Sequence, residues 1–439
     1  GGYFAERVSD IDEIQTRLIN KLAGIESAGL ILTSPTIVVA EDLTPADTAA
    51  LNLKFALALV CSHGGATSHT AIVARGLGIP AIVGCAGVME LEDGTSVLVD
   101  GRTGEVVVNP SADEVSTRTD KEAKLKARAE SVTGPGRLND GTPVQLLGNA
   151  GTVDDVRAAA KVGAEGIGLF RTELLFLDSQ TEPSVEEQVK TYSEVFDAMS
   201  GKKVVIRTLD AGSDKPVPYI NAIHEENPAL GVRGYRLIQD HRSFIEDQLK
   251  GLEAARVATG REIWVMAPMI ATAQEAAEFA ALARSIGSFK VGVMVETPSI
   301  AALLPDLQGV VDFISVGTND LSQYLFASDR LHPSLGTLLN PWQPPLIRAL
   351  AEIASEAKKV GIYSGVCGES ASDPAFAVVL AGMGFDSVSS SRSQVGAVRT
   401  ALSSITREQA EEIFQAVLSA KTADEAKAIA LAKLSLTAS

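Results

Sequence analysis

The sequence has 439 residues, with 38 lysines and arginines against 55 acidic residues, which gives a net charge of −17. So acidic a chain lacks the basic face that non-specific nucleic-acid binding needs, and we predict no nucleic-acid partner. We also predict no membrane partner, because no apolar run reaches the roughly 18 residues of a membrane span and the start has no signal-peptide pattern. Cys61, Cys85 and Cys367 are too few and too scattered for a disulfide framework or a zinc site, which predicts a cytoplasmic location.

The first 110 residues predict one helix followed by a small unit of alternating strands and helices. Apolar residues recur at helical spacing over residues 6–24. Residues 28–110 alternate short apolar segments with helix-forming segments and glycine turns. The expected strands cover residues 37–40, 55–61, 80–84, 96–100 and 105–108. One helix is expected to start near residues 42–45 and another after a loop at residues 64–69.

That loop has the most informative residues of the small unit. Two glycines, two hydroxyl residues and His69 come just before an apolar helix-forming segment. A helix N-terminus offers free N–H groups and a favourable dipole to an anion, and a histidine there can carry a phosphoryl group covalently. For an isolated histidine, capping or a structural partnership is the commoner role. The rest of the chain favours the phosphoryl role.

Residues 111–136 form the predicted connection to the second half. Residues 113–130 are rich in lysine, glutamate, alanine and arginine, which predicts a solvated linker helix. The run Gly134-Pro135-Gly136 then predicts a helix stop and a hinge.

Residues 137–439 predict a (β/α)8 TIM barrel. Eight apolar, β-rich segments recur there with helical stretches between them. They centre on residues 144–149, 166–170, 204–206, 264–268, 291–295, 313–316, 363–367 and 387–390. The long interval after the third segment predicts an inserted loop at 211–232, and residues 407–439 predict an amphipathic helix that closes the chain.

Polar residues follow five of these predicted strands. They are Arg171, Arg207, Glu296, the pair Asn319-Asp320, and Cys367. Barrel active sites lie at the carboxyl ends of the strands, so we expect these side chains to converge at one mouth. One such residue alone suits a salt bridge at the rim, but the same placement on five strands favours a site.

The residue types indicate what that site would bind. Arg171 and Arg207 carry planar guanidinium groups, which suit phosphate or carboxylate. Further positive charge would come from nearby loops, at Arg233, Arg330 and Lys215. Glu296 and Asp320 supply two hard oxygen ligands for Mg²⁺. Together they favour a small phosphorylated anion as substrate. Cys367 is a candidate proton donor, with a buried hydrophobic role as the alternative.

The two halves fit one mechanism. A phosphate donor would bind on the barrel, and the phosphoryl group would pass in line to His69 on the small unit. The small unit would therefore dock over the barrel mouth and leave again, swinging on the 111–136 linker.

The chain resembles enzyme I of the bacterial sugar phosphotransferase system, the phosphoenolpyruvate-protein phosphotransferases, over essentially its whole length. The segments that carry the resemblance are GGATSHTAIVARGLGIPAIVG (64–84), GAEGIGLFRTELLFLD (163–178), VVIRTLDAGSDKP (204–216), ENPALGVRGYR (226–236), GVMVETPS (292–299), DFISVGTNDLSQYLFASDR (312–330) and GVCGES (365–370). The implied fold is a swivelling phosphohistidine domain (28–110), a linker helix and hinge (111–136), and a phosphoenolpyruvate-binding TIM barrel that also dimerises (137–439).

The resemblance implies a role for each candidate residue. His69 would be phosphorylated on Nε2 and would pass the group to the carrier protein HPr. Cys367 would protonate the enolpyruvate carbon to release pyruvate. Phosphoenolpyruvate would bind to Arg171, Arg207, Asn319, Asp320 and Arg330, with Lys215 and Arg233 nearby, and Glu296 and Asp320 would hold Mg²⁺. The family forms a homodimer through the barrel and serves the first step of sugar uptake.

The chain departs from the family pattern at two places. Residues 1–27 resemble only the last part of the helical HPr-binding domain, so we expect poor transfer to HPr. Ala66 stands where relatives often have a basic residue.

Three alternatives remain open from sequence alone. Pyruvate phosphate dikinase and phosphoenolpyruvate synthase share the two domains, but their motif has cysteine before the histidine, where this chain has Ser68. A nitrogen-regulatory paralogue and a non-catalytic phosphoenolpyruvate sensor are the other two.

Overall fold

The computed structural model describes most of the chain, and the uncertain segments lie mainly in its first hundred residues. The described residues are 32–43, 47, 51, 54–64, 70, 71, 74, 79–101, 104–177, 181–212, 217, 219, 220, 225–330, 332 and 335–437. The expected helix at 6–24, the run around His69 and Lys215 lie outside them. The chain divides into two compact units, residues 1–118 with 331–333 and residues 119–330 with 334–439.

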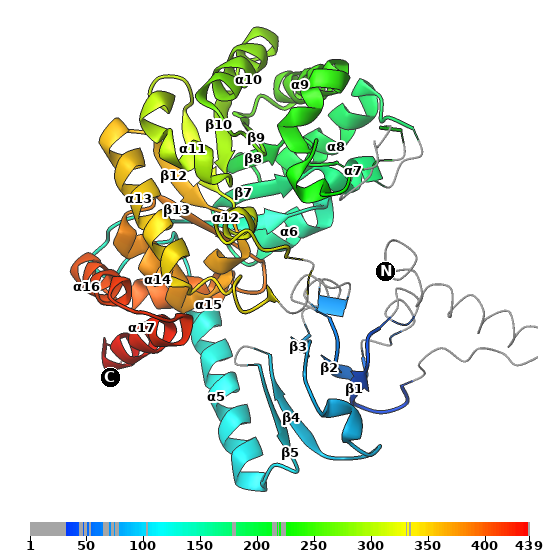
Figure 1. Ribbon diagram of the computed structural model, residues 1–439, viewed down its shortest axis with the longest axis vertical. Helices are drawn as coiled ribbons and strands as arrows, with labels where there is room; N and C mark the ends of the chain where they lie inside the picture. The colour runs from blue at the N-terminus through cyan, green and yellow to red at the C-terminus, as the bar shows by residue number, and fades with distance from the viewer. Residues whose placement is uncertain are drawn as a thin grey trace, which may run out of the picture. The chain divides into compact units, whose positions relative to one another are not determined.

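The first unit contains a parallel sheet and a separate hairpin (Figure 1). The sheet pairs β1 with β2 and β2 with β3, all parallel. The hairpin pairs β4 with β5 antiparallel. The bounds are Thr36–Ala40 (β1), Ala56–Cys61 (β2), Ala81–Ile82 (β3), Val88–Glu90 (η1), Val97–Asp100 (β4) and Glu105–Val108 (β5). All five expected strands are therefore present, and the third is shorter than predicted.

Helix α5 (Ala112–Ser131) confirms the predicted linker helix, and the boundary between the two units falls inside it. Near its start, Arg118 forms ion pairs with Asp100 at 3.1 Å and with Glu105 at 2.6 Å. Beyond its end, the buried Arg399 donates to the carbonyl oxygens of Val132 at 3.5 Å and of Gly163 at 2.7 Å. The two ends of the helix are thus held by different units.

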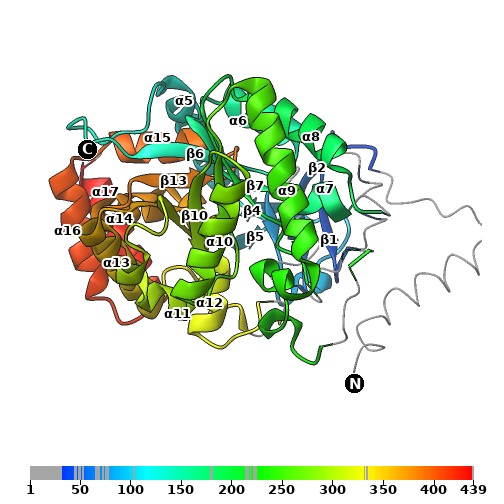
Figure 2. The same cartoon turned by 90° about the horizontal axis from the view of Figure 1, so that it is seen from above.

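Residues from 145 onward form a closed barrel of eight parallel strands, as the sequence predicted (Figures 1 and 2). Each strand pairs with the next one in the chain, and β13 closes the ring by pairing with β6. The strands are β6 Gln145–Ala150, β7 Gly166–Arg171, β8 Lys203–Arg207, β9 Trp264–Ala267, β10 Lys290–Val295, β11 Phe313–Val316, β12 Tyr363–Val366 and β13 Ser387–Ser390.

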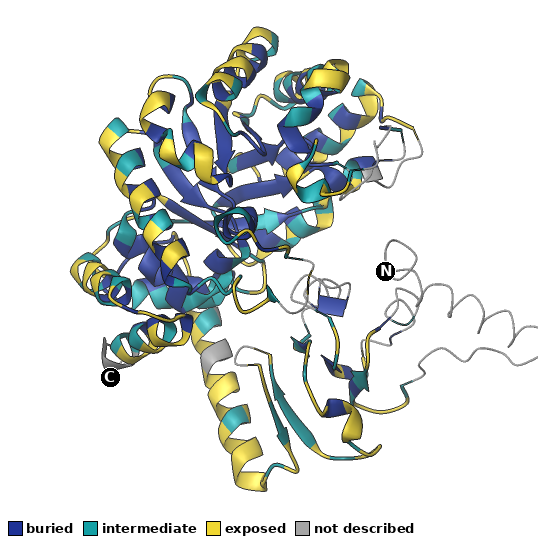
Figure 3. Cartoon of the chain, in the orientation of Figure 1, coloured by how far each residue is buried: buried dark blue, intermediate teal, exposed yellow. Residues whose placement is uncertain are grey.

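Helices surround the barrel strands, and Figure 3 shows the strands buried and the helices exposed on their outer faces. Their bounds are Val153–Lys161 (α6), Glu173–Leu177 (α7), Val185–Ala198 (α8), Ile238–Thr259 (α9), Ala273–Ile286 (α10), Pro298–Ala302 (α11), Thr318–Leu325 (α12), Pro344–Val360 (α13), Pro374–Met383 (α14) and Val395–Ser403 (α15). Short 3-10 helices occupy Pro228–Leu230 (η2), Gly234–Leu237 (η3), Leu304–Leu307 (η4) and Glu369–Ser372 (η6). Capping boxes begin α8 at Ser184 and α10 at Thr272.

The end of the chain differs from its prediction. Instead of one closing helix, residues 407–437 form α16 (Arg407–Leu418) and α17 (Ala423–Thr437). The break follows Ser419, where the backbone turns before a second helix start that bears Asp424 and Glu425. No helix in the described part of the chain has the length and apolar character to span a membrane.

Alternation along the strands separates two apolar cores. Val204 and Ile206 pack outward in the core beneath the helices, whereas Val205 packs into the barrel. The interior cluster contains Leu169, Val205, Met266, Met294, Phe313 and Cys367, with Trp264 and Tyr363 against it. The barrel is therefore filled by side chains, and a substrate site must lie at one of its ends.

Candidate active site

The two-residue period of the strands sets which polar side chains reach the barrel mouth. Leu169, Val205 and Met294 point into the barrel. The next inward residues toward the carboxyl ends are polar: Arg171, Arg207 and Glu296. Because parallel strands end at the same rim, the predicted convergence has a simple cause in strand register.

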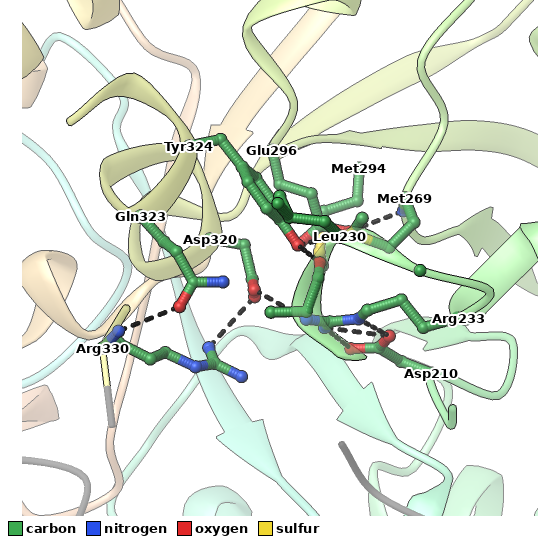
Figure 4. Close-up of polar contacts among 12 residues, drawn as sticks. Asp210, Leu230, Arg233, Met269, Met294, Glu296, Asp320, Gln323, Tyr324 and Arg330 are labelled. Atoms are coloured by element: carbon green, nitrogen blue, oxygen red, sulfur yellow. Dashed lines mark hydrogen bonds and ion pairs between the residues drawn. The ribbon is translucent and has the colours of Figure 1, made fainter. Parts of the chain in front are cut away.

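Six charged side chains of alternating sign form a continuous series of ion pairs at this mouth, which we call the alternating-charge chain. In order they are Glu173, Arg207, Asp210, Arg233, Asp320 and Arg330. Figure 4 shows the part from Asp210 to Arg330. The alternating-charge chain contains three acids and three arginines, so its six side chains carry no net charge. This balance is what permits so many charges in a buried place.

Arg233 lies in the middle of this series with a side chain only 1% exposed. Its Nη2 lies 2.9 Å from Oδ2 of Asp210, and its Nη1 lies 3.1 Å from Oδ1 of Asp320. The other carboxylate oxygen of Asp320, Oδ2, lies 3.2 Å from Nη1 of Arg330. The inserted loop after β8 is therefore joined to helix α12 through buried charge.

Asp210 joins the two site arginines at the other side. Its side chain is fully buried, and it accepts from Nε of Arg233 at 3.2 Å while Nη1 of Arg207 lies 3.2 Å from its Oδ2. Arg207 pairs through Nη2 with Glu173. Within the described ranges, Nε of Arg207 and Oε2 of Glu173 are buried with no hydrogen-bond partner. Such unmet hydrogen-bonding capacity beside a cluster of charges is typical of a ligand site.

Glu296 and Asp320 have the chemistry expected of metal ligands. Burial, followed by the charges of Asp320 and Asp210, raises the pKa of Glu296 to about 8. Oε1 of Glu296 accepts from the Met269 N–H at 2.7 Å. A Cβ on Gly317 would lie 2.8 Å from Oε2, so the glycine leaves room beside that oxygen. The two acids fit a divalent cation, which would relieve their mutual repulsion.

Protein side chains alone do not complete a metal shell at this place in the described part of the chain. No group of three or more histidine, cysteine, aspartate or glutamate side chains in the described ranges is arranged to hold a metal. A bound Mg²⁺ would therefore complete its shell with water and substrate oxygens, as this ion commonly does.

Cys367 directly follows β12, belongs to the interior cluster of the barrel and is buried. Burial raises the pKa of its thiol to about 11, with Ser315 and Arg207 opposing the shift. Its Sγ lies 3.6 Å from the Val316 carbonyl oxygen. A thiol that stays protonated at neutral pH suits a proton donor better than a nucleophile.

Arg171, Asn319 and Arg330 lie at the rim of the same mouth. Arg171 is exposed at the end of β7. Oδ1 of Asn319 accepts from the Glu369 N–H at 3.4 Å, and the Arg330 N–H donates to Oε1 of Gln323 at 3.0 Å. His69 and Lys215 lie outside the described residues.

The sequence analysis missed two members of the alternating-charge chain, Glu173 and Asp210. Both follow strand ends closely, at two residues after Arg171 and three after Arg207. Counting the acids as well as the arginines after each predicted strand would have found them.

Comparison with known families agrees with this arrangement. Residues 32–104 match the mobile domain of PEP-utilising enzymes, and residues 125–407 match the PEP-binding domain of PEP-utilising enzymes. A mobile-domain match followed by a barrel that matches the PEP-binding domain thus defines the chain as a PEP-utilising enzyme.

Individual relatives show which family of PEP-utilising enzymes the chain belongs to. The phosphoenolpyruvate-protein phosphotransferase of Streptomyces coelicolor is 44% identical over 99% of this chain and 79% of its own length. That of Bacillus subtilis is 38% identical over 96% of this chain and 77% of its own length. A solved structure, an NMR structure of Enzyme I (nEIt), is 37% identical and covers 29% of this chain and 52% of its own, at a TM-score of 0.25. The chain belongs to the phosphoenolpyruvate-protein phosphotransferase family, which confirms the resemblance found in the sequence.

Proposed function

We propose that this chain takes the phosphoryl group of phosphoenolpyruvate onto His69 and passes it to the carrier protein HPr, with release of pyruvate. The observation that supports this most is the buried alternating-charge chain at the barrel mouth, beside the acid pair Glu296 and Asp320. A neutral set of arginines and acids around a metal-type pair suits a small, multiply charged anion that arrives with a cation.

The arginines would hold the two anionic ends of phosphoenolpyruvate. Arg171, Arg207 and Arg330, together with the Asn319 amide, would bind phosphate and carboxylate oxygens, with Lys215 and Arg233 nearby. The buried Nε of Arg207 has no hydrogen-bond partner among the described residues, which supports its role as a donor to substrate. Fixed donors of this kind stabilise charge that builds on the transferred group without reorganising.

Glu296 and Asp320 would hold Mg²⁺. The ion supplies charge neutralisation at the phosphoryl oxygens when it is bound. The chain's own contribution is two buried carboxylates whose orientation is set, in Glu296, by the Met269 N–H.

Two residues would carry out the covalent and proton-transfer steps. The His69 imidazole would attack phosphorus, forming the N–P bond as the bond to the enolate oxygen breaks. The Cys367 thiol would then give its proton to the methylene carbon of the enolate, and pyruvate leaves. The high pKa of Cys367 supports this role, because the proton is present at neutral pH.

The wider assignments from the sequence belong to the same proposal. They are a cytoplasmic location, a homodimer through the barrel, and a swivelling domain at 28–110 that moves on the 111–136 linker. Residues 1–27 would be what this sequence contains of the HPr-binding domain.

Phosphorylation by labelled phosphoenolpyruvate tests the proposal. In the presence of Mg²⁺ the chain should acquire an acid-labile, base-stable label that intact-mass and peptide mass spectrometry locate on His69. His69→Ala should remove the label, and a chelator should prevent its formation.

His63→Ala is the matched control, because it removes the nearby loop histidine, whose Nδ1 lies 3.0 Å from Ser62 Oγ. It should label like the wild-type chain. Label that persists in His69→Ala would refute the nucleophile assignment. Binding of phosphoenolpyruvate with no label on the wild-type chain would instead favour a sensor.

A further inference from the structure

We propose that Asp210 is a positioning residue that fixes the two site arginines, Arg207 and Arg233, in the orientation that receives substrate. The inference rests on the proposed function, because it concerns how that site binds phosphoenolpyruvate. It starts from the place of Asp210 between two guanidinium groups, with its side chain fully buried.

The contacts of Asp210 restrict rotation as well as supply charge. Arg233 reaches it with Nε and Nη2, at 3.2 Å and 2.9 Å, which is a two-point contact that defines the plane of the guanidinium. Nη1 of Arg207 meets the same carboxylate at 3.2 Å. A single carboxylate therefore fixes the orientation of two guanidinium groups.

The backbone around Asp210 is itself held firmly. The Thr208 N–H donates to the Met266 carbonyl at 2.9 Å, and the Leu209 N–H donates to Oε1 of Gln248 at 3.0 Å. One residue beyond Ala211, Gly212 forms an isolated antiparallel bridge with Arg233. A Cβ on Gly212 would lie 2.7 Å from the Val232 carbonyl oxygen, so only glycine allows the loop to approach this closely.

Without the carboxylate, two positive groups would face each other in a buried place. Their repulsion, together with the lost two-point contact, would turn both guanidinium groups away from the positions that they now hold. Losing one charge-assisted hydrogen bond to substrate costs about 10- to 100-fold in affinity. Asp210 thus affects substrate binding through the arginines without needing to touch the substrate.

Two variants separate orientation from charge. Asp210→Asn keeps the size and one acceptor oxygen but loses the charge. Asp210→Glu keeps the charge but moves it out by one methylene. If Asp210 positions the arginines, both variants raise the KM for phosphoenolpyruvate, by about 10- to 100-fold, with a matching rise in Kd from calorimetry. If Asp210 only compensates charge, the Asn variant binds the anion more tightly and the Glu variant resembles the wild type.

Asp312→Asn is the matched control. Its carboxylate accepts from the Val291 N–H at 2.8 Å and pairs with Arg284 at 3.2 Å, at the start of β11 and therefore at the opposite end of the barrel. It should keep the wild-type KM. Thermal unfolding of each variant is measured beside binding, and a KM change at an unchanged unfolding temperature identifies the positioning effect.

The outcomes are distinct. Wild-type binding with an unchanged KM in both Asp210 variants overturns this inference alone, and so does tighter binding by the Asn variant. A wild-type chain that binds no phosphoenolpyruvate overturns the proposed function and this inference together.

Discussion

Arg171 and Arg207 are both proposed to bind phosphoenolpyruvate, but their surroundings differ. Arg207 is buried against Glu173 and Asp210, so its removal takes the ion-pair partner from Glu173 and one of two arginines from Asp210. Arg171 is exposed at the rim. A substitution of Arg171 therefore reports on substrate binding with less disturbance of the fold.

We expect Arg171→Ala to raise the Kd for phosphoenolpyruvate about 10- to 100-fold, because a charge-assisted hydrogen bond is worth about 1.5–3 kcal/mol. Isothermal calorimetry with Mg²⁺ present measures it. The free energy of unfolding should stay near that of the wild type. An unchanged Kd would remove Arg171 from the binding set.

Cys367 leads to a second expectation at this scale. Cys367→Ala should lower pyruvate release about 100-fold or more, because a placed proton donor contributes at least that much. The Kd for phosphoenolpyruvate should change little, since the thiol is not among the charged binding groups. A coupled assay of pyruvate under single turnover checks the rate, and near wild-type release would assign the protonation to another group.

Close approach between elements matters as much as any one side chain. After β12, Gly368 passes directly against the start of α12. A Cβ there would overlap Oγ1 of Thr318 and would lie 2.7 Å from the Thr318 backbone nitrogen. Because Asn319 and Asp320 begin the same helix, this contact sets where both point.

We expect Gly368→Ala to lower the free energy of unfolding by about 1–3 kcal/mol, as overpacking typically does. Urea unfolding measures the loss. Adding Thr318→Ala should restore only part of it, since the contact with the backbone nitrogen remains. Full stability of the single variant would show that the two elements separate without cost.

Lys203 shows how one end of the barrel affects the stability of the whole chain. At the start of β8, its Nζ lies 3.6 Å from the centre of the Trp264 ring and 3.8 Å from that of Tyr363. Burial lowers the pKa of Lys203 from 10.5 to about 7, with Asp386 and Glu262 opposing the shift. Between these two values the unfolded chain binds a proton that the folded chain does not, so stability should rise with pH.

The comparison variant is Lys203→Met, which has no charge to bury. Relative to it, the wild-type free energy of unfolding should increase by about 2 kcal/mol from pH 6.5 to pH 9. Urea unfolding at the two pH values gives the difference. Lys290→Met, an exposed change at the start of β10, controls for lost positive charge. If the wild-type free energy of unfolding, relative to that of Lys203→Met, instead falls as the pH rises, the Trp264 and Tyr363 rings stabilise the protonated ammonium group.

Most of the architecture follows from local pattern. The eight barrel strands and the linker helix were predictable because apolar period and helix composition act over a few residues. The polar residues after the strands were predictable because strand register carries them to one rim. The two helices at the end of the chain were read as one because a local signal was overlooked. Thr422 and Glu425 have the spacing of a helix cap, and the Glu425 N–H donates to Oγ1 of Thr422 at 3.2 Å.

The pairing within the site was not predictable in the same way. Arg233 meets Asp320 across 87 positions in the sequence, and Arg207 lies 87 positions from Met294. Whether an arginine serves a substrate or an acid depends on such distant contacts. Asp210 could have been found from its place after β8, but its pairing with Arg233 could not.

The alternating order of the six charges determines how this mouth can change through mutation. Loss of a central member leaves two like charges as neighbours, Asp210 and Asp320 if Arg233 is replaced. Loss of an end member, Glu173 or Arg330, breaks one contact and creates no new repulsion within the series. Tolerance to substitution should therefore increase from the centre outward, and central positions should change only together with a neighbour of opposite sign.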